Sequence, residues 1–228
     1  MKYIVLPEEL DKERPLSFYL TMEEYVAQHV DEPDAFFIWQ VGPSVIYGRN
    51  QQQENEVDVA YCEQRGIRMF QRKSGGGCVY SDWGNVMLSY VTKEDNAGRA
   101  FYTFLNMIVL VLRRMGIDAT TTSHNDVLVD GRKVSGTACR RLPGRCIVHG
   151  TLLYDTDMEN MVRSITPSPE KLQRKGVESV RQRITLLKDY TSMGVDELKA
   201  FIRQTLCTGE LMLSADDVAA IEAMDCEY

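Results

Sequence analysis

The sequence contains no long hydrophobic run. No apolar stretch approaches the roughly 20 residues that span a bilayer, and the longest candidate, Met107 to Leu112, ends at Arg113 and Arg114. The N-terminal residues turn acidic at Glu8 and Glu9 before an export signal develops. We therefore expect a cytoplasmic protein with no membrane partner.

The chain also lacks an excess of basic residues. Its 228 residues include 26 Lys and Arg against 33 Asp and Glu, a formal charge of −7. Nucleic acids and membrane surfaces bind basic faces, so neither is expected as a partner, although a local basic pocket for a phosphate is compatible with this balance. With no internal repeat, low-complexity segment or Pro/Gly/Ser-rich linker, the sequence predicts a single domain over residues 1–228.

Disulfide and zinc patterns are missing as well. The six cysteines follow no framework spacing in a chain that is long enough to fold without disulfides, so we expect free thiols in a reducing compartment. Cys139, Cys146 and His149, with His124, could be combined into a zinc site. Their Cys-x6-Cys-x2-His spacing matches no standard structural zinc pattern, however, and no metal site is predicted.

Secondary structure is predicted from hydrophobic periodicity and from the residues that end each run. Helices are expected at 17–30, 57–65, 100–115, near 158–165, 195–206 and from 214 onward. Strands are expected at 36–39, 45–47, 67–70, 78–80, 86–91, 126–129, 133–135 and 147–154, while 179–187 is ambiguous. Gly42-Pro43 suggests a hairpin between the first two strands, and Asp130-Gly131 predicts another because both turn positions favour positive φ. Hairpins outnumber βαβ crossovers, which indicates an α+β domain with a mixed, mainly antiparallel sheet flanked by helices.

Three consecutive glycines follow a basic segment between two of these strands. Glycine loses more backbone entropy on folding than any other residue, so Gly75-Gly76-Gly77 indicates a close approach of backbone to a ligand rather than an ordinary loop. With Arg72 before them, the backbone N–H groups suit a phosphate. The segment is neither a P-loop nor a dinucleotide fingerprint, because the further residues of both motifs are missing.

Two further side chains are candidates for chemistry. Lys133 stands across the predicted hairpin from Asn125 and Asp126, so it is either an edge-strand lysine or a buried lysine paired with an acid that could hold a phosphate and an acyl carbonyl. His149 lies in an apolar strand, where a lone histidine is more often a satisfied core residue than a catalyst.

Six segments of the chain, taken in order, resemble the lipoate–protein ligase and lipoyltransferase family. They are Arg72-Lys73-Ser74-Gly75-Gly76-Gly77, Asp82-x-Gly84-Asn85, Asn125-Asp126, Gly131-Arg132-Lys133-Val134-Ser135-Gly136-Thr137-Ala138, His149-Gly150-Thr151-Leu152-Leu153 and Lys175-Gly176-Val177-x-Ser179-Val180-Arg181-x-Arg183-Ile184. Each motif alone is weak, but together they cover the chain from about Trp39 to Leu187. The resemblance implies an α/β domain shared with biotin–protein ligases, a bifurcated pocket for lipoyl-adenylate, and transfer of the acyl group to a lysine of a carrier domain.

The resemblance also implies which residues form the pocket. Lys133 is the expected catalytic residue, touching both phosphate and acyl carbonyl, and Arg72 is expected to contact the nucleotide. Because the acyl chain is apolar, a slot lined by residues such as Trp39 and Val79 is expected. The complete expected set is Trp39, Arg72, Ser74, Gly75, Gly76, Gly77, Cys78, Val79, Tyr80, Asn85, Asn125, Asp126, Lys133, Gly136 and His149. The implied ligands are ATP with Mg²⁺, and lipoate or lipoyl-adenylate.

The expected partners are apo lipoyl domains of 2-oxoacid dehydrogenase complexes or the glycine cleavage H protein. The sequence departs from the bacterial ligase pattern at Ser81, where a histidine is usual, and at Gln71, where a second arginine is usual. It also ends at Tyr228, whereas two-domain bacterial ligases continue into a small C-terminal domain that supports adenylation. That domain is therefore expected to be absent, and a separate accessory subunit is a candidate partner.

Two alternatives to a ligase remain open. Cys146, in Cys-x-x-His-Gly, is similar to the nucleophilic cysteine of octanoyltransferases of the related amidotransferase class. A Cys146 thiolate with a lowered pKa next to Lys133 could accept an octanoyl or lipoyl group from a thioester without ATP. The other alternative is a family member that binds lipoate or a lipoylated domain without catalysis, although the presence of Lys133 argues against it. Biotin is less favoured as the substrate, because the arginine-rich loop of biotin ligases is missing.

Overall fold

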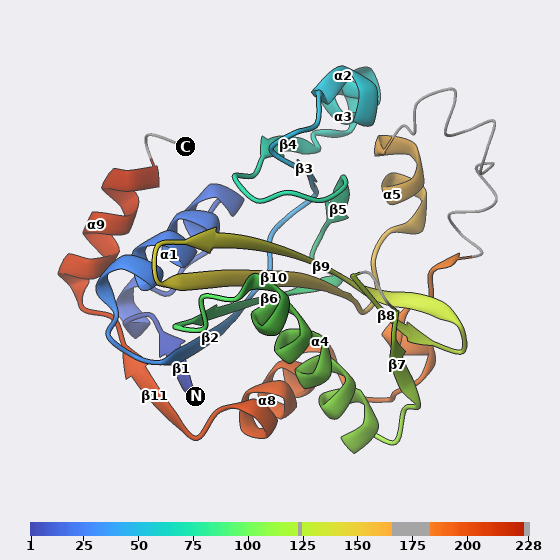
Figure 1. Ribbon diagram of the computed structural model, residues 1–228. Coiled ribbons are helices and arrows are strands. Elements are labelled where there is room, and N and C mark those ends of the chain that lie inside the picture. The colour runs from blue at the N-terminus through green and yellow to red at the C-terminus, as the bar shows by residue number, and fades with distance from the viewer. Residues whose placement is uncertain (123–124, 166–182, 226–228) are drawn as a thin grey trace.

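An eight-stranded sheet forms the centre of the computed structural model, which describes residues 1–122, 125–165 and 183–225 (Figure 1). The strand order is β11-β1-β2-β6-β10-β9-β8-β7. In chain order the strands are β1 (Lys2–Val5), β2 (Asp34–Trp39), β6 (Asn85–Thr92), β7 (Ala119–Thr121), β8 (Asp126–Val129), β9 (Arg132–Leu142), β10 (Arg145–Leu153) and β11 (Gly209–Met212). Only β1 is parallel to its neighbours β11 and β2, so the sheet is mixed and mainly antiparallel, as predicted.

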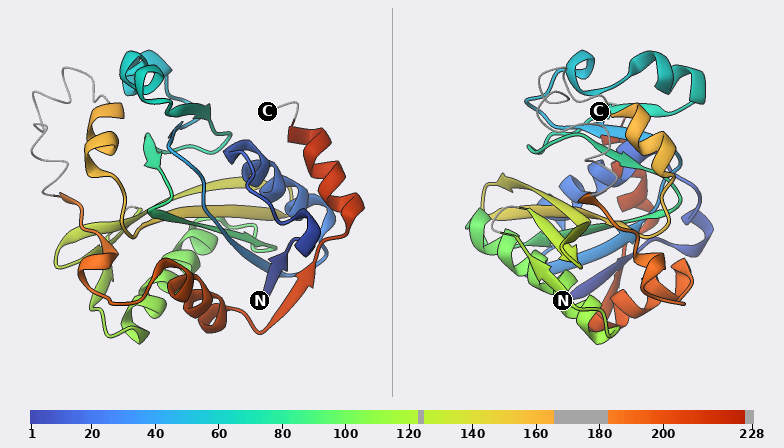
Figure 2. Two further views of the ribbon diagram at one scale, coloured as in Figure 1. Left: turned by 180° about the vertical axis from the view of Figure 1, so that it is seen from behind. Right: turned by 90° about the vertical axis from the view of Figure 1, so that its right-hand side faces the viewer.

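A second sheet, of three strands, lies across the long β9–β10 hairpin (Figures 1 and 2). Its order is β4-β3-β5, with β3 at Ser44–Tyr47, β4 at Arg68–Gln71 and β5 at Val79–Ser81. Helices α2 (Gln53–Glu56) and α3 (Val59–Arg65) lie on its outer side, and α5 (Met158–Ser164) lies beside it. This small sheet has its own apolar cluster, which includes Val45, Tyr61, Tyr80 and Met161.

Helices cover both faces of the large sheet. Helices α4 (Ala97–Arg114) and α8 (Val195–Leu206) pack on one face, whereas α1 (Leu16–His29) and α9 (Ala215–Asp225) pack on the other. The single turns η1 (Glu8–Leu10) and η2 (Leu187–Asp189) complete the described elements. No helix in the described residues is long and apolar enough to cross a membrane.

Local signals in the sequence explain several of the boundaries. Asp58 accepts a hydrogen bond from the Tyr61 N–H at the start of α3, and Gly66 ends that helix in the left-handed region at φ 65°. Asp130 and Gly131 have φ values of 50° and 72°, so the predicted tight turn between β8 and β9 is confirmed.

The hairpin predicted at Gly42-Pro43 is wrong. Strand β2 belongs to the large sheet and β3 to the small one, so this segment carries the chain from one sheet to the other. Gly and Pro mark the end of a strand equally well in a turn and in a crossover, and the apolar runs on either side cannot distinguish the two. Strands β1, β7 and β11 were not predicted, and residues 179–182 of the ambiguous segment 179–187 lie outside the described residues.

Candidate functional site

A cavity between the two sheets has two arms that meet at Lys133. One arm, of about 100 Å³, is lined by Leu20, Trp39, Ile46, Arg72, Gly76, Gly77, Cys78, Val79, Met87, Asn125, Lys133, Gly136, Thr137, Ala138, His149, Gly150 and Thr151. The other, of about 220 Å³, is lined by Cys78, Val79, Tyr80, Lys133, Gly136, Thr151, Leu153, Met161, Val162, Ile165 and Ile184. The arms share Cys78, Val79, Lys133, Gly136 and Thr151. We call the first the Trp39 arm and the second the Tyr80 arm.

Lys133 has the acidic partner that the hairpin predicted. Its Nζ lies 2.7 Å from Oδ1 of Asp126, and the two side chains are 34% and 27% exposed. Strand β8 supplies the acid and β9 the lysine, so the Asp130-Gly131 turn brings the pair together. A partly exposed ammonium at the junction of two arms can interact with negative charge on a ligand in either of them.

Gly136 makes room for this lysine. A Cβ built at Gly136 would lie 2.7 Å from Lys133 Nζ and 2.9 Å from its Cε, both closer than van der Waals contact allows. The end of a lysine side chain is flexible, so a substitution here would move the ammonium rather than break the fold.

Gly136→Ala is therefore expected to change the position of Lys133 in the site without lowering the stability of the fold. The ammonium would leave its place beside Asp126, and the transfer activity proposed below would fall between about tenfold and a hundredfold, since small displacements of a catalytic group have effects of this size. The denaturation midpoint should stay close to that of the parent protein. Full activity with an unchanged midpoint would show that the position of Lys133 is not critical.

The glycine loop is built around Arg72. This side chain is 5% exposed, and its guanidinium donates hydrogen bonds to Ser74 Oγ and to the carbonyl oxygens of Ile46, Gly75 and Gly77. Arg72 lines the Trp39 arm, as expected, but these donors are directed at the protein's own loop. The contact between Arg72 and a nucleotide remains a prediction.

The three glycines have different roles. Gly76 has a φ of 95°, and a Cβ there would lie 2.9 Å from Nη2 of Arg72. Its carbonyl oxygen approaches Gly48 so closely that a Cβ on Gly48 would be 2.3 Å away. Gly75 and Gly77 have no other atom within 4 Å of a built Cβ, and Gly75 does not line either arm. Close packing within the protein therefore requires a glycine at position 76, which also lines the Trp39 arm, and its contact with a ligand remains a prediction.

His149 belongs to a buried polar network behind the Trp39 arm. Its Nδ1 lies 2.9 Å from Oε2 of Glu23, and its Nε2 lies 2.9 Å from Ser74 Oγ. Glu23 accepts a hydrogen bond of 2.6 Å from Ser89 Oγ, which in turn accepts one of 2.8 Å from Nε1 of Trp39. The interpretation of His149 as a satisfied histidine is thus correct, and it lines the arm as well.

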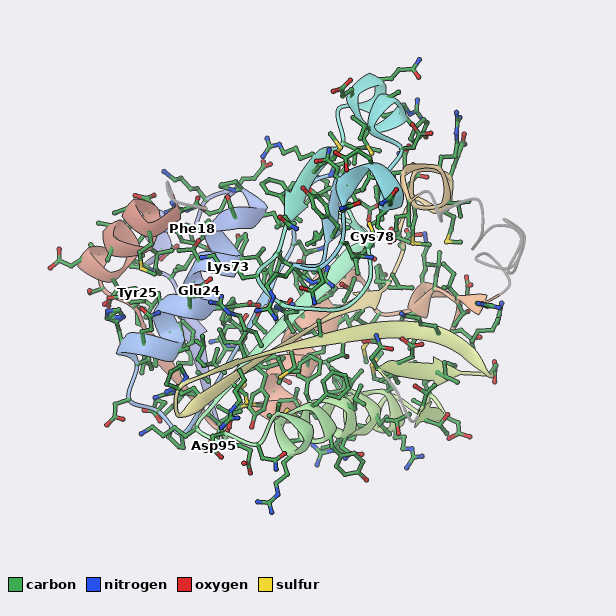
Figure 3. All side chains as sticks on the ribbon, turned by 45° about the horizontal axis from the view of Figure 1, so that its top comes forward. Phe18, Glu24, Tyr25, Lys73, Cys78 and Asp95 are labelled. Carbon is green, nitrogen blue, oxygen red and sulfur yellow. The ribbon has the colours of Figure 1, made fainter. Side chains whose placement is uncertain are left out.

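Glu24, the next residue of α1, holds the other side of the glycine loop. Its Oε1 lies 2.9 Å from Lys73 Nζ and 2.6 Å from Nη1 of Arg140 (Figure 3 labels Glu24 and Lys73). Helix α1 thus places two consecutive carboxylates behind the loop that carries Lys73 and Ser74. Sequence reasoning missed both, because it counted only the apolar stripe of this helix. Two adjacent acids within such a stripe were the available signal.

The prediction of a reactive Cys146 thiolate next to Lys133 is wrong. Cys146 is fully buried in the cluster on the α4 face of the sheet, with Val148 and Leu152, whereas His149 faces the cavity. Burial raises the pKa of the Cys146 thiol, contrary to the lowered pKa that a nucleophile needs. The thioester route is therefore not supported. Since Cys146 and His149 point to opposite faces, they also cannot share a zinc ion, and His124 lies outside the described residues.

Cys146→Ser is expected to affect stability and not catalysis. The hydroxyl would be buried in an apolar cluster, which costs about 1–3 kcal/mol of the free energy of unfolding if it finds no partner. Transfer per folded molecule should match that of the parent protein. Urea unfolding and a transfer assay on the same samples would check this, and loss of transfer with unchanged stability would restore the thioester hypothesis.

The remaining predicted residues divide into three groups. Cys78, Val79 and Tyr80 line the cavity, and so does Asn125, whose Nδ2 donates to the Thr137 carbonyl. Asp126 and Ser74 line neither arm, but Asp126 contacts Lys133 and Ser74 contacts His149. Asn85 does not reach either arm: it is completely buried and donates to Tyr80 O and Thr156 Oγ1, so it fixes the turn between β5 and β6.

A metal-binding cluster is not found in the part of the chain that the structure describes, where no three His, Cys, Asp or Glu side chains come together. The described cysteines, Cys62, Cys78, Cys139, Cys146 and Cys207, are free thiols.

The fold and the site define an α+β domain with a pocket whose two arms meet at a lysine. Residues 15–207 match the family described as the lipoyl protein ligase A/B catalytic domain, and the chain belongs to this family. The resemblance noted from the six motifs is thereby confirmed.

Over the aligned residues, two curated relatives are about one third identical to this chain. The chain is 35% identical over 173 residues to the lipoate-protein ligase LplJ of Bacillus subtilis, covering 75% of this chain and 52% of the relative. It is 34% identical over 191 residues to lipoate–protein ligase 1 of Staphylococcus aureus, covering 82% of this chain and 58% of the relative. The chain thus spans about half the length of the curated relatives it matches.

The fold is also similar to that of solved ligase structures. One is the bipartite lipoate protein ligase of Thermoplasma acidophilum, with a TM-score of 0.86 at 24% identity, covering 99% of this chain and 92% of the other. Another is lipoate-protein ligase A bound with ATP, with a TM-score of 0.84 at 22% identity, covering 99% and 94%. At these identities the likeness establishes the fold alone.

Proposed function

We propose that this domain attaches lipoate, through lipoyl-adenylate, to a specific lysine of a lipoyl carrier domain. The observation that carries the proposal is the position of Lys133, whose ammonium lies where an apolar arm and a second arm meet. An acyl-adenylate has the same layout: an apolar chain and a nucleotide joined at a carbonyl next to a phosphate. The names of the two curated relatives, both lipoate–protein ligases, support the same reaction.

The residues of the two arms suit the two halves of that ligand. Leu20, Trp39 and Met87 form apolar walls in the Trp39 arm, which suits the acyl chain. The larger Tyr80 arm is lined by Tyr80, Leu153, Met161 and other apolar side chains, which suit the flat face of a base. ATP would supply the adenylyl group that activates the carboxylate. Any Mg²⁺ would be held mainly by the phosphates, with Asp126 as the nearest carboxylate to the lysine.

The transfer step requires stabilisation of negative charge, and Lys133 is the residue that supplies it. The carrier lysine, as the free amine, forms a C–N bond to the acyl carbonyl carbon and loses a proton to water. The bond from that carbon to the phosphate oxygen then breaks, and AMP leaves. Negative charge develops first on the carbonyl oxygen and then on the departing phosphate. One ammonium between the two arms stabilises both charges.

The carrier protein is part of the proposal. The Thermoplasma ligase is described with its E2 lipoyl domain, and we propose a lipoyl domain of a 2-oxoacid dehydrogenase complex, or the glycine cleavage H protein, as the acceptor here. That ligase is bipartite, which makes an accessory subunit a reasonable addition to any assay of adenylation.

Mass spectrometry of an apo lipoyl domain tests the function. The chain would be incubated with the carrier and one of three donors: ATP, Mg²⁺ and lipoate; preformed lipoyl-adenylate; or octanoyl-carrier protein. A lipoyl mass shift from lipoyl-adenylate is expected, and one from ATP and lipoate would place adenylation on the same chain. A shift with octanoyl-carrier protein alone would indicate a transferase instead. No shift with any donor would contradict the proposal and favour a binding protein.

A further inference from the structure

Glu23 is a buried carboxylate that the transfer reaction does not use. It is 3% exposed and lines neither arm, but it contacts two residues that connect it to the Trp39 arm. Through Ser89 it is linked to Nε1 of Trp39, and directly it meets Nδ1 of His149. The Glu23 carboxylate therefore lies behind both Trp39 and His149, the two side chains that line this part of the arm.

The donors and acceptors of this network can be assigned one by one. Ser74 Oγ accepts a hydrogen bond of 3.0 Å from Nε of Arg72, so its single proton is available for Nε2 of His149. If Nε2 accepts, then Nδ1 carries the imidazole proton and donates it to the Glu23 carboxylate. Ser89 likewise accepts from Trp39 and gives its own proton to Glu23. Every donor and acceptor of this network then has a partner, and His149 needs no second proton.

We propose that Glu23 is a positioning residue of the Trp39 arm. It holds His149 as the neutral Nδ1–H tautomer and, through Ser89, fixes Trp39, so that neither side chain offers a free donor or acceptor to the cavity. The wall that His149 and Trp39 form thereby presents no unpaired polar atom to the arm. The inference rests on the proposed function only in taking this arm as the acyl site.

The consequence is a rule for the far end of the acyl chain. An alkyl or dithiolane end loses nothing when it packs against Trp39 and His149, because the polar groups of these two side chains already have partners. A chain that ends in a hydroxyl or ureido group would bury that group against Trp39 and His149 without a hydrogen bond from either side chain, which weakens binding. Glu23 thus sets specificity against polar acyl chains without touching the ligand.

The tautomer of His149 tests the positioning directly and requires no substrate. The chain has three histidines, so the ¹⁵N signals of His149 can be assigned by their loss in His149→Phe. We expect the parent protein to carry the proton on Nδ1 at neutral pH. In Glu23→Gln we expect the Nε2–H form to become populated, because the amide can no longer accept from Ser89 and His149 with two oxygens. A parent protein with Nε2–H or doubly protonated His149 would overturn the inference.

Calorimetry with two non-hydrolysable analogues tests the specificity rule. The probes are the octanoyl and 8-hydroxyoctanoyl adenosine sulfamates. The parent protein should prefer the octanoyl analogue by at least about tenfold, and Glu23→Gln should reduce that preference to below about threefold. Glu24→Gln is the matched control, because it removes the neighbouring charge but contacts Lys73 and Arg140 rather than His149. Its preference should equal that of the parent protein.

The outcomes separate this inference from the function on which it rests. If neither analogue binds while His149 carries Nδ1–H, the proposed acyl site is wrong and the positioning stands. If the octanoyl analogue binds but Glu23→Gln keeps the parent preference, the positioning is wrong and the function stands. Should Glu23→Gln fail to fold, Ser89→Ala replaces it: it removes the hydrogen-bond acceptor of Trp39 and should narrow the preference, and an unchanged preference would contradict the inference.

Discussion

Lys133→Ala is expected to lower acyl transfer to the carrier by about a hundredfold to a thousandfold, which corresponds to roughly 3 kcal/mol or more of transition-state stabilisation. The reason is the loss of the Lys133 ammonium at the junction of the two arms. The fold should survive, because the side chain is partly exposed and its bond to Asp126 lies at the cavity. Single-turnover transfer from lipoyl-adenylate would measure the effect apart from adenylation.

Lys188→Ala is the matched control for this experiment. Lys188 Nζ lies 2.6 Å from Oδ2 of Asp155, so the chain loses a Lys–Asp pair of similar geometry, but one that is 56% and 45% exposed and lines neither arm. Transfer by Lys188→Ala should equal that of the parent protein. A transfer rate in Lys133→Ala within threefold of the control would show that the junction lysine is not part of the chemistry.

Gly76→Val is expected to reduce the affinity for a non-hydrolysable lipoyl-adenylate analogue by about a hundredfold, near 3 kcal/mol of binding free energy. A side chain at this position meets Nη2 of Arg72 and requires a backbone with φ of 95°, which valine rarely adopts. The loop would have to rearrange around Arg72, and the Trp39 arm would lose its wall. Isothermal calorimetry on the folded variant would measure the change.

The neighbouring glycine provides the comparison. Gly75→Ala places a Cβ in open space at an ordinary backbone conformation, so its affinity should remain within about threefold of the parent value. Equal affinities for Gly76→Val and the parent protein would show that the shape of the loop is unimportant for the pocket.

Local signals predicted much of the fold and part of the site. The Asp130-Gly131 turn, the helix end at Gly66 and the pairing of Lys133 with an acid follow from neighbours in the sequence, and all three are found in the structure. The error at Gly42-Pro43 arose because strand ends look the same whether the chain turns back or crosses to another sheet. The network around His149 joins positions 126 residues apart in the chain, and no local pattern reports such a contact.

The prediction for Cys146 was wrong for a different reason, because the sequence alone shows which face of the strand this residue occupies. Side chains alternate between the faces of a strand, so residues separated by three positions point in opposite directions. With His149 facing the cavity, Cys146 had to face the core, as it does among Val148 and Leu152. A short Cys-x-x-His-Gly match does not show which face of the strand each side chain occupies, whereas the alternation along the strand does.

The location of the cavity between two sheets has a consequence for how the protein responds to its ligand. The small sheet, with its separate apolar cluster, supplies Cys78 and Val79, whereas the large sheet supplies Lys133 and Thr151 on the opposite wall. A ligand that fills both arms adds contacts between the two sheets, so binding and the cohesion of the two halves are thermodynamically linked. We therefore expect saturation with an acyl-adenylate analogue to slow amide hydrogen exchange in β3 and β5 more than in β6. Substitutions deep in the small core, such as Val45→Ala, should weaken binding without touching the ligand.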